Sequence, residues 1–75
     1  MVNVITVEPC ANGWAVLQDG VANPQIFSSG AKAEDAARRL GRRLAEAGRS
    51  SEVVVYLRDG ALGGRIACPA VAPDA

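Results

Sequence analysis

The chain has 75 residues, a length that fits one domain. Eight basic residues balance eight acidic ones, so the chain has no overall field that would favour nucleic acid or an anionic membrane. Hydrophobic residues make up 49% of the chain, but there is only one Trp, one Phe, one Tyr and one Met. We therefore expect a light core, one that contains few large side chains. A core of this kind gains from a partner, and we therefore expect a homodimer.

Two strands are predicted at the N-terminus. Residues 2–7 are β-branched almost throughout, and Pro9 is expected to end this strand because proline cannot donate to a sheet ladder. Asn12-Gly13 tolerates positive φ, and residues 14–18 alternate as a second strand. We expect an antiparallel pair joined by a loop longer than a two-residue turn.

A short third strand at a sheet edge is expected over residues 25–27, followed by a helix over 31–47 that Ser28 or Ser29 caps. Apolar residues spaced by three and four form one stripe on this helix: Ala33, Ala36, Ala37, Leu40, Leu44 and Ala47. Gly41 stands beside the stripe, where a small residue lets the helix lie close to a sheet.

Residues 52–57 form the strongest predicted strand, and their apolar run favours a central position. Residues 61–64 are predicted to be a loose loop and 65–68 a final strand. The order β-β-(β)-α-β-β predicts an α+β two-layer sandwich, an antiparallel sheet of four to five strands with one helix on one face. The other face is then solvated or covered by a second subunit. We assign residues 1–69 to the domain and 70–75 to a flexible C-terminal tail.

Trp14 is the only tryptophan, and it follows Gly13 at the start of the second predicted strand. It is either the anchor of the core or an exposed platform. Because other large side chains are few, we expect it to be buried under the helix against Leu40 or Leu44, on the same face as Val16. These five residues are the structural markers of the predicted fold.

The sequence lacks the residues that several kinds of catalysis and metal binding require. The chain has no histidine, the commonest general base and metal ligand, and its two cysteines, Cys10 and Cys68, are too few for a structural zinc site. We expect no catalytic, cofactor-binding or metal-binding residues. Without a secretion signal or a membrane-spanning apolar run, a cytoplasmic protein with free thiols is expected.

Basic residues concentrate on the predicted helix. Between positions 32 and 49 the chain carries six basic and three acidic residues, and Glu34-Asp35 stands four residues before Arg38-Arg39 at ion-pair spacing. The five candidate contact residues on the helix are Lys32, Arg38, Arg39, Arg42 and Arg43. They form a solvated helix face, a surface for a protein partner, or a phosphate-contacting face for RNA or DNA. Base stacking would have to use Trp14 or Tyr56, since the helix has no aromatic residue.

The chain resembles a small bacterial family of unknown function, family 2188, over roughly residues 4–67. The matching pieces are Pro9, Gly13, Trp14, Val16, Phe27, Lys32-Ala33-Glu34, Ala36-Ala37, Val53-Val54, Asp59-Gly60 and Arg65-Ile66. Two departures stand out: the family's capping Thr falls on Ala31, and residues 61–64 are inserted after Asp59-Gly60. The resemblance supports the predicted fold and implies no activity.

Two functions follow as hypotheses. The leading one is a non-enzymatic module that acts through protein–protein contact, as a homodimer. The alternative is a nucleic-acid-binding accessory protein that uses the arginine-rich helix. An enzyme is the least favoured class, because no catalytic constellation is present.

Overall fold

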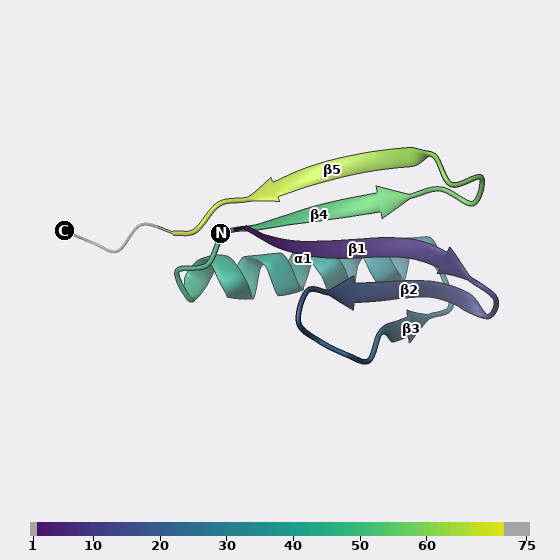
Figure 1. Ribbon diagram of the computed structural model, residues 1–75, viewed down its shortest axis with the longest axis horizontal. Helices are drawn as coiled ribbons and strands as arrows, with labels where there is room; N and C mark the ends of the chain where they lie inside the picture. Colours follow the sequence, from purple (N-terminus) through teal and green to yellow (C-terminus); the bar gives the residue numbers. More distant parts are fainter. Residues whose placement is uncertain (1, 72–75) are drawn as a thin grey trace.

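The computed structural model describes residues 2–71 as one five-stranded sheet with a single helix on one face (Figure 1). The elements are β1 (Asn3–Cys10), β2 (Gly13–Gln18), β3 (Gln25–Phe27), α1 (Gly30–Glu46), β4 (Ser51–Tyr56) and β5 (Leu62–Cys68). Across the sheet the strands follow the order β3-β2-β1-β4-β5. This confirms the α+β fold and the predicted order of elements, including the edge position of β3.

The sheet is mixed, so the prediction of a purely antiparallel sheet is wrong. β1 pairs antiparallel with β2, but parallel with β4. The reason is the direction of α1. The chain leaves β3 in the direction of β1, returns along the helix, and must then enter β4 in the direction of β1 again (Figure 1).

The first hairpin has a shorter loop than expected, and its first strand is longer than expected. β1 runs through Pro9 to Cys10, and Ala11 and Asn12 alone separate it from β2. The predictions that Pro9 ends the strand and that the loop exceeds two residues are therefore both wrong.

Pro9 is tolerated in β1 because its nitrogen faces the β4 side, where β1 is no longer hydrogen-bonded to a neighbouring strand. The Val4 N–H donates to Asp19 Oδ2 over 3.1 Å, and the Val4 carbonyl accepts from the Asp19 N–H over 3.2 Å, so Val4 faces β2. Backbone groups alternate along a strand, which directs Pro9 toward the β4 side. Pairing with β4 stops at Val7 opposite Val55, two residues earlier. The missing N–H costs no hydrogen bond.

β5 also begins earlier than predicted, at Leu62 rather than at residue 65. Leu62 pairs with Tyr56 and Gly64 with Val55, so Gly63 is an extra residue on β5, a bulge. The segment predicted as a loose loop therefore extends the second hairpin.

The start of the predicted tail is attached to the domain. The Ala70 N–H donates to Ser50 Oγ over 3.0 Å, and the Val71 N–H donates to the Ala45 carbonyl over 2.9 Å. These two residues belong to the ordered part of the fold. The rest of the predicted tail, residues 72–75, lies outside the described residues.

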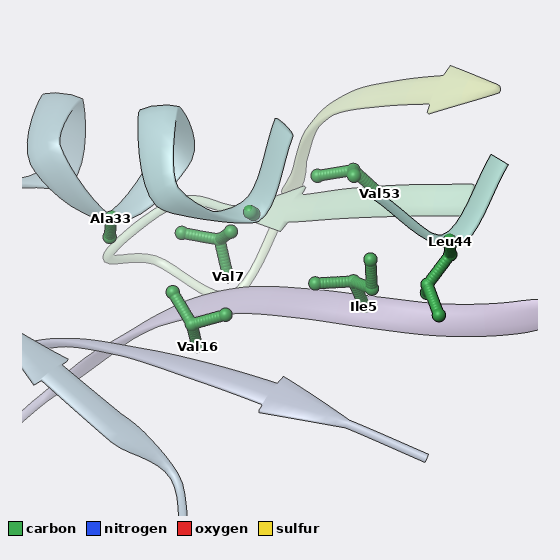
Figure 2. Packing of buried hydrophobic residues seen from close by; sticks show 7 residues of the cluster. Ile5, Val7, Val16, Ala33, Leu44 and Val53 are labelled. Atoms are coloured by element: carbon green, nitrogen blue, oxygen red, sulfur yellow. The ribbon is translucent and has the colours of Figure 1, made fainter. Parts of the chain in front are cut away.

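The helix is capped by Ser29, whose Oγ accepts from the Lys32 N–H over 3.2 Å. This confirms one of the two predicted caps. Under the helix, the core cluster joins β-branched strand residues to two alanines and one leucine of the helix (Figure 2). Its buried members are Ile5, Val7, Val16, Ala33, Ala37, Leu44 and Val53. Val16 and Leu44 are thus core residues, and Leu40 packs against the core while half-buried.

Trp14 has a different neighbour from the expected one. A Cβ added to Gly30 would lie 3.1 Å from Trp14 Cε2, so the half-buried indole packs against the first turn of α1. Leu40 is ten residues further, about 15 Å along the helix. The prediction that Trp14 is buried under the helix against Leu40 or Leu44 is therefore wrong. The guanidinium of Arg58 lies 5.3 Å from the centroid of the ring.

Gly13 is required where β2 meets β3. Its φ is +143°, and an added Cβ would lie 2.2 Å from the Phe27 carbonyl oxygen. We expect Gly13→Ala to lower the free energy of unfolding by about 3 kcal/mol, because it adds backbone strain to a backbone clash. Urea unfolding measures this loss. Gly20→Ala is the control, since Gly20 has a φ of +79° and nothing within 4 Å of the added Cβ; an equal loss in both variants would contradict the clash.

Gly41 lets α1 approach β4 and β5, as predicted. An added Cβ would lie 2.7 Å from Cys68 Sγ and 3.3 Å from Ser51 Oγ. We expect Gly41→Ala to destabilise the protein, since overpacking of about 1–3 kcal/mol exceeds the gain in helix propensity of about 1 kcal/mol. In a Cys68→Ala background the cost should fall by about 1 kcal/mol. Thermal unfolding of the four proteins of this double-mutant cycle tests the contact, and strictly additive effects would refute it.

Candidate functional site

The five candidate basic residues, Lys32, Arg38, Arg39, Arg42 and Arg43, are all exposed on α1. Two of them form the predicted ion pairs one turn apart, Arg38 with Glu34 at 3.2 Å and Arg39 with Asp35. Lys32 Nζ donates to Ser28 Oγ over 3.4 Å. Within residues 2–71, Arg42 and Arg43 make no ion pair.

The arginines form two rows with different surroundings. Arg39 and Arg43 line a groove between α1 and the β2–β3 side of the sheet, whereas Arg38 and Arg42 do not. The structure thus separates residues that the sequence presents as one basic cluster.

This groove has a volume of about 480 Å³. Apolar residues of strands and helix form part of it, with Val16, Phe27 and Leu40 packed in or against the core. The remaining lining residues come from α1, from the end of β2 and from the chain that leads into β3: Gln18, Val21, Asn23, Gln25, Ala36, Arg39 and Arg43. The groove was not predicted from the sequence. Its signals are the small Ala36 on the apolar stripe and the amide side chains that flank the short β3.

The free edge of β5 exposes backbone hydrogen-bonding groups. The Ser50 carbonyl accepts from the first residue of β1, so by alternation Val53 faces β5, and Ile66, its partner, faces β4. The N–H and C=O groups of Arg65 and Ala67 must then point away from the sheet. Both residues are exposed, and no strand among the described residues pairs with this edge.

The sheet face opposite the helix is partly apolar. Ala15 and Val54 are 6% and 5% exposed there without any covering helix, because neighbouring side chains shield them. Tyr56 lies on this face, where it lines a shallow depression with Val4, Thr6 and Leu17. Trp14 lies on the helix side, so the two candidate stacking aromatics do not form one platform.

Cys10 and Cys68 are free thiols, as predicted. Cys10 lies at the first hairpin, whereas Cys68 pairs with Ser51 at the end of the sheet where β1 begins. Within residues 2–71, the single helix is neither long nor apolar enough to cross a membrane.

Comparison with known proteins identifies one family. The match covers residues 5–68 and is to DUF2188, described as an uncharacterized protein conserved in bacteria. No curated protein and no solved structure matches the chain significantly. The matched span runs from the third residue of β1 to the end of β5, and it therefore contains nearly all of the sheet and the whole helix described above. This chain belongs to the bacterial family DUF2188.

Proposed function

We propose that this chain is a non-enzymatic cytoplasmic module that acts through protein–protein contact, and that it forms a homodimer through the free edge of β5. The observation that supports this most directly is the outward direction of the Arg65 and Ala67 backbone groups. Unpaired edge strands are templates for another strand, and proteins usually block those that are not used. The light core, whose largest fully buried side chains are Ile5, Val7 and Val53, gives a second reason for a partner.

A two-fold axis through Ile66 satisfies the outward groups. In an antiparallel β5–β5 pair, Arg65 of one copy stands opposite Ala67 of the other, and each such pair exchanges two backbone hydrogen bonds. The Ile66 side chains of the two copies meet on the helix side. Arg65 keeps its ion pair with Glu52, at 3.1 Å, so the pairing introduces no unpaired charge. The product is a ten-stranded sheet, five strands from each copy, with both helices on one face.

Ala67→Pro tests this edge. Proline at 67 removes an N–H that faces away from β4, so the internal ladder of the protomer remains intact while dimer hydrogen bonds are lost. We expect the parent chain to sediment as a dimer and the variant as a folded monomer with an unchanged circular dichroism spectrum. Ala67→Ser, which keeps the N–H, is the matched control and should remain dimeric.

Crosslinking locates the axis. In a chain without its native thiols (Cys10→Ser, Cys68→Ser), Ile66→Cys should form an interchain disulfide, because non-hydrogen-bonded antiparallel partners lie about 4.5 Å apart at Cα. Ala67→Cys should not, since residue 67 faces Arg65 of the other copy. A monomeric parent chain, or a dimer in which Ala67→Cys crosslinks and Ile66→Cys does not, would refute the β5 pairing.

Nucleic-acid binding through α1 is the alternative. It is favoured by Arg42 and Arg43, which have no acidic partner in residues 2–71, and by the dimer geometry, which would place two basic helices on one face. If this function is right, the chain binds a phosphate-bearing column at low salt and elutes as salt rises. Changing Arg38, Arg39, Arg42 and Arg43 together to Gln should abolish retention. A parent chain that flows through at low salt would rule this function out.

A further inference from the structure

We propose that the groove between α1 and the β2–β3 side of the sheet binds a small organic carboxylate with an apolar body. This ligand site is separate from the proposed dimer contact, because β3 and β5 are the two opposite edges of the sheet. Failure of one proposal therefore leaves the other standing.

The size and composition of the groove fit such a molecule. Its volume of about 480 Å³ falls within the range of about 300–1,000 Å³ that is typical of small-molecule sites. Val16 is 5% exposed and belongs to the core, while Phe27 and Leu40 are half-buried and packed against it. These side chains are held in place, so the apolar part of the groove exists before any ligand arrives.

The space arises from the lengths of neighbouring side chains. Ala36 lines the groove where a larger residue on the helix stripe would fill it. β3 has only three residues, and the connection 19–24 that leads into it supplies Val21 and Asn23 to the wall of the groove. An apolar chain can therefore lie between helix and strand.

The charge on the groove selects the head group. Arg39 and Arg43 stand one turn apart on the same wall and can present guanidinium donors to one anion. Arg39 is paired with Asp35, but both side chains are 63% exposed, so this pair is weak and can open. Asp35 offsets one of the two positive charges, which leaves a site suited to a monoanion. Gln18, Asn23 and Gln25 add neutral donors and acceptors on the strand side.

Sodium octanoate is the probe for this site. In a titration of the ¹⁵N-labelled full chain, we expect saturable shifts of the backbone amides of Val16, Phe27 and Leu40. Octanol, which has the same apolar body without the charge, should bind about tenfold more weakly, because a charge-assisted hydrogen bond is lost.

Two pairs of substitutions isolate the charge. Arg39→Gln with Arg43→Gln should weaken octanoate binding about tenfold or more. Arg38→Gln with Arg42→Gln removes the same formal charge from the other row and should leave the affinity within about twofold. Ala36→Leu should abolish binding by filling the groove. Absence of shifts at the groove, equal losses in the two double variants, or equal binding of octanol would overturn the proposal.

Discussion

The fold depends on how closely α1 lies on the central strands. Ala33 and Ala37 are fully buried against the sheet, and at Gly41 the spacing leaves no room for even a methyl group. Small helix residues bring the backbone close to the β-branched side chains of β1 and β4, so that a few medium-sized residues can fill the space between helix and sheet. A domain with one tryptophan and one phenylalanine can be built in this way.

The same close approach determines which surfaces remain open. A single helix cannot cover five strands, and α1 lies over the middle of the sheet (Figure 1). On one side of the helix the short β3 and Ala36 leave the groove; on the other, β5 presents an unpaired edge. The proposed ligand groove and the proposed dimer edge both exist because the layer that covers the sheet is a single helix. They lie at opposite edges of the sheet.

Features that depend on nearby residues could be predicted from the sequence. β-branched runs located the strands, spacing by three and four located the helix, and Ser29 was one of two predicted caps. Prediction failed for features that depend on contacts between segments far apart in the sequence. Pro9 remains in β1 only because β4 pairing has already stopped at Val7, and β4 is parallel because of the path of the whole crossover. The groove was missed because its walls come from two β strands, their connection and the helix, none of which shows a signal alone.

The parallel pairing of β1 with β4 also has a kinetic meaning. β1 and β2 are neighbours in the chain and can form a hairpin early, whereas Asn3 meets Ser51 only across the entire crossover. Closing so long a segment is entropically costly and makes such contacts form late. During synthesis on a ribosome, the edge of β1 that pairs with β4 therefore stays unpaired until β4 has left the exit tunnel. During that interval this edge of β1 can pair with a strand of another chain.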